Sequence, residues 1–141
     1  MTDETFAPTI RTQADLEAAW RALMGPWGYG RHSLWLMVLL DDVPVPQLTE
    51  VEGCTEPPDT TTTEQFARLL ARLSGDLGPG LRFAMLRTRP GPSHVEELDR
   101  EWARSVYDAC ALAEVACEIV HLGTEERVRP LPPDEVMLAS A

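Results

Sequence analysis

Five polar side chains stand close together where an apolar segment gives way to a helical pattern. They are Arg87, Arg89, Ser93, His94 and Asp99, within the sequence LRFAMLRTRPGPSHVEELD of residues 81–99. In α/β proteins, the junction between a strand end and a helix N-terminus is a common place for binding and catalytic sites. We therefore take this cluster as the candidate site of the chain.

Arg87 and Arg89 are two residues apart, so an extended backbone directs both side chains to the same side. Two guanidinium groups beside a helix N-terminus could hold the carboxylate or phosphate of a small ligand. In an acidic chain they could instead pair with Glu96, Glu97 or Asp99. We favour the internal ion pairs over the small anionic ligand.

Asp99 falls in the first turn of the helix that this pattern predicts. At 100° per residue it lies about 50° from the centre of the apolar stripe of Leu98, Trp102 and Val106. A carboxylate in the first turn interacts favourably with the positive end of the helix dipole. Asp99 is therefore either a capping acid or an acid directed into a pocket, and the pattern leaves both open.

Residues that could bind a metal or act as a nucleophile form no complete motif. The sequence has no C-x-x-C, H-x-H, H-E-x-x-H or G-x-S-x-G pattern. His94 and Glu96 match the H-x-E half of a zinc deaminase signature whose P-C-x-x-C half is missing, so a zinc hydrolase or deaminase built from them and a cysteine is our weakest hypothesis. A Ser93–His94–Asp99 triad would require neighbours in one loop to point at one another, which is rare. We expect no catalytic residues, no metal ligands and no cofactor.

Hydrophobic periodicity predicts the element order α-β-β-α-β-α-β-β around this cluster. A hairpin followed by alternating strands and helices predicts a mixed sheet of about five strands flanked by three helices. The expected helices lie between residues 12 and 25, from 61 to about 77, where a capping box at Thr61–Glu64 opens the pattern, and from about 95 to 114. The expected strands cover residues 33–40, 45–53, 81–86, 117–122 and 127–131.

The chain of 141 residues is long enough for one domain with one hydrophobic core. We place this single α/β domain at residues 11–131. Residues 1–10 are expected to form a disordered N-terminal tail, and residues 132–141 an exposed C-terminal tail.

The charge of the chain restricts its partners. The formal net charge is −11, and all 12 basic residues are arginines, which fits the codon bias of a GC-rich bacterial genome. Binding to nucleic acid or to an anionic membrane normally rests on clustered Lys and Arg, so we expect neither partner. The sequence has no signal-peptide pattern and no apolar run that could span a membrane. An odd number of cysteines, three, without a secretory signal favours a cytoplasmic protein with reduced thiols.

Several segments, taken with the order of the elements, resemble one known family. The motifs are IRTQADL from residue 10, LLD ending at residue 41, EVEGCT at 50–55, the strand at 83–90 and the serine and aspartate of 93–99. Over residues 10–131 they resemble the RadC-like branch of the JAB/MPN metalloprotease-fold family. The resemblance implies a JAB/MPN-like fold, and cytidine-deaminase-like folds share much of the same hydrophobic skeleton.

The metal ligands of that family are not matched in this chain. Active members bind zinc through H-x-H and an aspartate, and a glutamate before the first strand is the general base. Here Arg87 and Arg89 occupy the H-x-H positions, His32 or Ser33 stands near the glutamate position, and Asp99 alone matches a ligand. A guanidinium has no lone pair for a metal. The resemblance therefore implies that the metal site is lost and that the arginines could replace the ion by pairing with Asp99.

The leading hypothesis from the sequence is a non-catalytic, metal-free JAB/MPN-like domain. It would act as a protein-interaction or scaffolding module, with a protein partner or a second copy of itself. Four tryptophans, some of which could be exposed, are consistent with such a role. The alternative is an enzyme or small-anion-binding protein that uses a strand-end pocket lined by Arg87, Arg89, Ser93 and Asp99.

Overall fold

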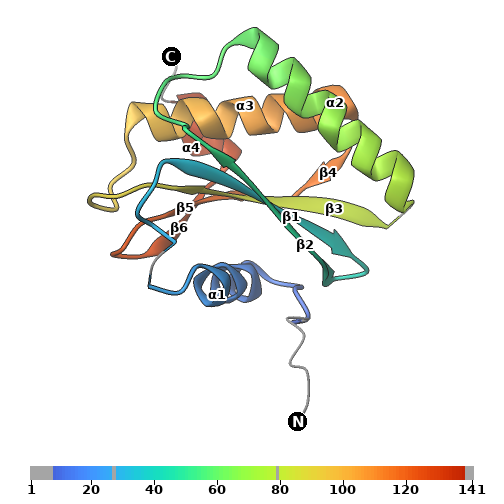
Figure 1. Ribbon diagram of the computed structural model, residues 1–141, viewed down its shortest axis with the longest axis horizontal. Helices are drawn as coiled ribbons and strands as arrows, with labels where there is room; N and C mark the ends of the chain where they lie inside the picture. Colours follow the sequence, from blue (N-terminus) through green and yellow to red (C-terminus); the bar gives the residue numbers. More distant parts are fainter. Residues whose placement is uncertain (1–7, 27, 79, 139–141) are drawn as a thin grey trace.

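A central sheet with helices on both faces forms the fold (Figure 1). The computed structural model describes residues 8–26, 28–78 and 80–138. The strands are β1 (Ser33–Leu40), β2 (Val43–Glu52), β3 (Leu81–Thr88), β4 (Ala116–Cys117), β5 (Val120–Gly123) and β6 (Val128–Leu131). The helices are α1 (Gln13–Met24), α2 (Thr60–Leu77), α3 (Glu97–Ala113) and α4 (Pro133–Leu138).

The sheet is mixed, as the sequence predicts. The strands lie side by side in the order β2-β1-β3-β5-β6, and β4 also pairs with β3. β1 is antiparallel to both β2 and β3, β4 and β5 are parallel to β3, and β6 is antiparallel to β5. The central strand β3 is flanked on both sides by other strands, and residues 83–89 are all buried. The mixed α/β class is thereby confirmed.

The two faces of the sheet carry separate apolar cores. Because side chains alternate along a strand, Phe83 and Met85 face α2, α3 and α4, whereas Ala84 and Leu86 face α1. Figure 1 shows α1 alone on one side and the other three helices on the opposite side. The side chains at odd-numbered positions of β3 therefore face α3, and Arg87 lies on that side of the sheet.

Two helix starts show how local sequence determines these boundaries. Thr12 and Asp15 form the expected capping box of α1, with the Thr12 Oγ1 accepting from the Asp15 amide at 3.0 Å. The capping box expected at Thr61–Glu64 is wrong. Asp59 caps α2 instead, because its carboxylate accepts from the amide and the hydroxyl of Thr62, both at 2.8 Å.

The expected numbers of strands and helices are also wrong. The strand expected at 117–122 is two strands, since the chain leaves the β3 ladder at residues 118–119 between β4 and β5. The sheet therefore has six strands. The segment expected as an exposed C-terminal tail contains the fourth helix, α4, whose Val136 is fully buried against the core.

The described part of the expected N-terminal tail is also packed. Ile10 is 1% exposed, lies in the core under α1 and donates its amide to the carbonyl of Asp42 at 2.7 Å. Residues 1–7 of that expected tail lie outside the described residues. Among the helices of the described ranges, none has the length and apolar character needed to cross a membrane.

Candidate functional site

Arg87 lies near the end of β3 and is completely buried. Its Nε donates to Asp99 Oδ1 at 3.2 Å, and its Nη1 donates to the carbonyl of Cys54 at 2.8 Å. Its Nη2 lies 3.0 Å from His32 Nδ1. Since a guanidinium can only donate, His32 must accept through an unprotonated Nδ1. One side chain thus joins β3 to α3, to the loop after β2 and to the segment before β1.

Arg89, one position beyond β3, is 1% exposed and is held on every nitrogen. Its Nε and Nη2 each lie 2.9 Å from Asp99, on Oδ1 and Oδ2 respectively. The remaining hydrogen bonds go to the carbonyls of Pro90, Pro92 and His94, at 2.8–3.1 Å. The loop between β3 and α3 therefore wraps around this guanidinium.

Asp99 lies where the two arginines meet, and none of its surface is exposed. Besides the arginines, its Oδ2 accepts the backbone amide of Glu96 at 2.9 Å, which caps the start of α3. Burial alone would raise the pKa of Asp99. The hydrogen bonds from Arg89, from the Glu96 amide and from Arg87 outweigh burial and hold the pKa below its ordinary value.

The cluster contains two cations and one anion in the interior. A further carboxylate, that of Glu96, lies 3.7 Å from Arg89 Nε and is 47% exposed. Burial is the largest influence on Arg87 and lowers its pKa, although Asp99 opposes this effect. Buried charges are stable only when they are paired and hydrogen-bonded, so removing one member of this network leaves a costly unpaired charge.

Ser93 and His94 do not join the other three side chains. The Ser93 amide donates to Glu126 at 2.6 Å, and the His94 side chain is 68% exposed. His94 contributes only its carbonyl, which accepts from Arg89. A triad with Asp99 is not assembled, because both oxygens of Asp99 are bonded to the arginines and the Glu96 amide.

The cysteine of α3 is too far from Glu96 to share a zinc site with it. Cys110 is 14 residues along α3 from Glu96, which corresponds to about 21 Å of helix. Across the described ranges, no three His, Cys, Asp or Glu side chains are grouped so that they could hold a metal ion.

No match to a known protein was found. The chain matches no family model, no curated protein and no solved structure. The JAB/MPN resemblance therefore rests on the sequence motifs and the order of the elements alone.

Sequence reasoning missed His32 and the Cys54 carbonyl as members of the network. Ser33 pairs with Thr88 in the β1–β3 ladder, so His32 necessarily lies beside the end of β3. Burial, followed by the charges of Arg87 and Arg89, lowers the pKa of His32. The available signals were its position directly before a strand and the family resemblance, which placed His32 or Ser33 near the glutamate position. Neither pointed to Arg87, which lies 55 residues away.

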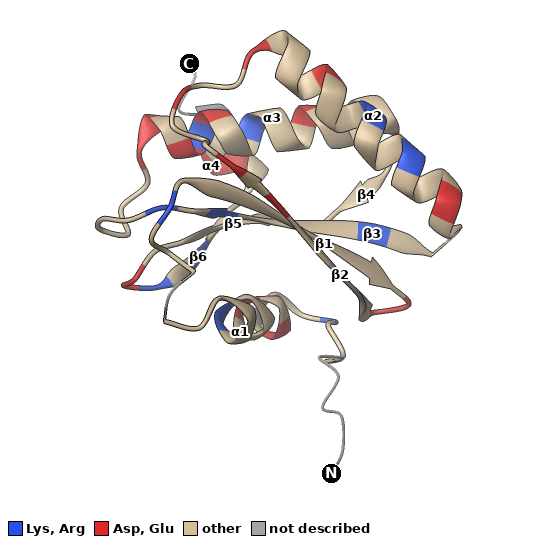
Figure 2. Ribbon diagram, viewed as in Figure 1, with Lys and Arg blue, Asp and Glu red and all other residues tan. Residues whose placement is uncertain are grey.

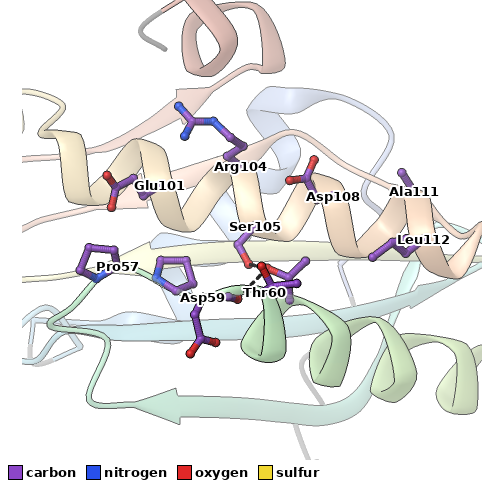
Figure 3. Close-up of a pocket in the computed structure, with 11 residues that line it drawn as sticks. Pro57, Asp59, Thr60, Glu101, Arg104, Ser105, Asp108, Ala111 and Leu112 are labelled. Atoms are coloured by element: carbon purple, nitrogen blue, oxygen red, sulfur yellow. Dashed lines mark hydrogen bonds between the residues drawn. The ribbon is translucent and has the colours of Figure 1, made fainter.

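A groove lies on the outer surface between the start of α2 and the length of α3 (Figure 3). Its volume is about 740 Å³. One end has Pro57 beside Glu101, and the other has Ala111 and Leu112 beside Asp108 (Figure 3). Pro58 also lines the groove. Leu112 is 63% exposed. The groove thus combines apolar ends with acidic side chains.

The walls of this groove are fixed by three interactions. The hydroxyls of Thr63 and Ser105 lie 2.6 Å apart and join α2 to α3. Trp102 Nε1 donates to the Glu56 carbonyl at 3.0 Å and holds the loop that carries the two prolines. The same loop is held at Cys54 by Arg87. The buried network therefore supports one end of the groove from below.

Proposed function

We propose that this chain is a non-catalytic, metal-free JAB/MPN-like domain that acts as a protein-interaction or scaffolding module. The observation that carries the proposal is the convergence of Arg87 and Arg89 on Asp99. These are the positions at which the resemblance implies metal ligands. The convergence supports the reading that an ion-pair network stands where active members hold zinc.

The same geometry bears on the alternative of a small-anion site. An anion needs guanidinium N–H groups that are accessible and not already bonded. Arg87 and Arg89 are buried, and Arg89 donates from all three of its nitrogens to protein oxygens. The network supports a structural role for both arginines more strongly than ligand binding.

An interaction role is supported by the outer surface. The groove beside α3 is open, and its lining combines an exposed leucine with two prolines and three acidic side chains. The groove lies on the layer formed by α2 and α3, on the opposite side of the sheet from α1. A module that binds through this surface needs no catalytic group.

Identification of a stoichiometric protein partner tests the proposal. Tagged protein is recovered from the cells that express it, co-purifying proteins are identified, and each complex is reconstituted from purified components. We expect a defined complex by size-exclusion chromatography with light scattering, either with a second protein or with further copies of this chain. A strictly monomeric protein with no reconstituted partner would refute the interaction role.

A further inference from the structure

We propose that the groove between α2 and α3 binds a basic, amphipathic segment of a partner protein. This inference rests on the proposed interaction role and names the kind of partner. The groove is formed by two stretches of chain, residues 57–63 and 101–112.

The acidic side chains of the groove have no cationic partner within the described chain. Asp59, Glu101 and Asp108 form no ion pair among the described residues, whereas 8 other carboxylates of the described chain pair with an arginine. Arg104 is the one cation of the lining. Its Nη2 donates to the Val136 carbonyl at 3.3 Å, toward α4. The groove therefore offers negative charge that a partner can neutralise.

The positions of these carboxylates fix the spacing that a partner must present. Glu101 and Asp108 are seven residues apart on α3, which is about two turns and about 10 Å along the axis. Two cationic side chains at i and i+7 of a helix, or at i and i+3 of an extended segment, span the same distance.

The apolar ends require more than charge. Pro57 lies at one end, and Ala111 and Leu112 lie at the other (Figure 3). An apolar side chain placed against Leu112 removes the most exposed large hydrophobic residue of the described chain from water. A simple polyamine supplies the cations without this contact, so the combination favours a peptide segment.

Neither residues 1–7 and 139–141 nor a second copy of this sequence matches the charge of the groove. Residues 1–7 (MTDETFA) and 139–141 (ASA) contain no Lys or Arg. A second copy would bring the same acidic groove, and two copies each carrying a net charge of −11 repel each other. Figure 2 shows both acidic and basic residues along α2 and α3, but the lining of the groove itself has three acidic side chains and one arginine. Charge complementarity thus favours a different, basic protein.

The groove is already formed, which favours binding. Thr62 donates two hydrogen bonds to the Asp59 carboxylate, and the Thr63–Ser105 contact holds the two walls of the groove together. A partner would therefore lose its own conformational freedom on binding without also having to order the groove.

Fluorescence anisotropy with labelled peptides of about twelve residues tests the inference. One peptide set carries arginines at i and i+7 with leucines on the same helical face, and a second places them at i and i+3. Matched peptides replace arginine with glutamate or leucine with serine. We expect the basic amphipathic peptides to bind with micromolar Kd, more tightly at low salt, and neither replacement to bind comparably.

Variants of the protein locate the binding. Glu101→Gln with Asp108→Asn should weaken binding roughly tenfold, and Leu112→Ser should weaken it about fivefold. The matched control, Asp76→Asn with Glu125→Gln, removes the same charge at exposed positions outside the groove and should stay within about twofold. Circular dichroism confirms that each variant is folded.

Three results would overturn the inference: failure of every basic peptide to bind, equal binding by the groove double variant, or competition by spermidine as strong as by unlabelled peptide. These outcomes are separable from failure of the interaction role. A reconstituted partner that binds wild type and the groove double variant equally would refute the groove while leaving the interaction role intact.

Discussion

Arg89 and Asp99 form a two-point ion pair in the interior, with Nε 2.9 Å from Oδ1 and Nη2 2.9 Å from Oδ2. Parallel N–H donors that match two carboxylate oxygens are the strongest and most directional form of this interaction. Because Asp99 also accepts the Glu96 amide, the pair locks the end of β3 to the first turn of α3.

Asp99→Asn should strongly destabilise the fold. The substitution keeps the size of the side chain but removes its charge, and it leaves two buried guanidinium groups without a counter-ion. Breaking a buried ion pair in this way costs about 3–5 kcal/mol. Urea denaturation measures the free energy of unfolding. Asp108→Asn, an exposed position on the same helix, is the control and should change it by less than about 0.5 kcal/mol.

A double-mutant cycle tests whether Arg87 and Asp99 act together. Asp99→Ala leaves both arginines unpaired, and Arg87→Ala in that background removes one of the two stranded charges. The double variant should therefore be more stable than the sum of the single effects predicts, with a coupling of about 0.5–3 kcal/mol. Additive losses, with no rescue by Arg87→Ala, would show that Arg87 does not depend on Asp99.

Stability should fall as the solution is acidified. Burial is the main cause of the lowered pKa of both His32 and His121 in the folded state. The unfolded chain therefore binds protons below about pH 6.5 that the folded chain does not, and acid favours unfolding in that window. The paired Asp99 adds a further loss only below about pH 4, as its lowered pKa is approached.

Denaturation at a series of pH values measures this dependence. His121→Gln should flatten it between about pH 7.5 and about pH 5, because glutamine does not titrate. His94→Gln, at a side chain that is 68% exposed, is the matched control for the loss of a histidine. If His121→Gln and the wild type showed the same pH dependence of the free energy of unfolding, His121 would not be its cause.

Trp102→Phe should weaken both the fold and the groove. Phenylalanine keeps most of the buried ring but leaves the Glu56 carbonyl without its donor. We expect a loss of about 1–2 kcal/mol in the free energy of unfolding. Because Glu56 directly precedes Pro57 and Pro58, the basic peptides should also bind less tightly, by about threefold. Unchanged affinity would show that this loop does not support the binding surface.

Much of the layered fold could be predicted from local patterns. The apolar run of β1, the stripe of α3 and the capping box at Thr12 depend on neighbours within a few residues, which a sequence displays directly. The pairing of Arg87 and Arg89 with nearby acids was also predicted, with Glu96, Glu97 and Asp99 left as the possible partners, and the structure selects Asp99. The sequence left open whether Asp99 is a capping acid or an acid directed into a pocket. In the structure Asp99 caps α3 and is also fully buried.

The remaining features depend on residues distant in the sequence. His32 and the Cys54 carbonyl reach Arg87 across 55 and 33 residues, and a backbone carbonyl has no residue type that marks it. The groove combines two segments about 40 residues apart. The sequence of either segment alone predicts only a solvent-exposed surface. The helix α4 is short and begins at a proline, and among its described side chains Val136 is the one that packs into the core.

Thermal unfolding of the wild-type protein in the presence of candidate ligands tests the central claim most directly. Zinc, phosphate, nucleotides and small carboxylates are each added to the purified protein, and zinc content is measured by elemental analysis. We predict no bound zinc and no rise in Tm, because Asp99 is held by Arg87 and Arg89. Stoichiometric zinc, or a Tm increase that Arg87→Ala abolishes, would contradict a closed, non-catalytic network.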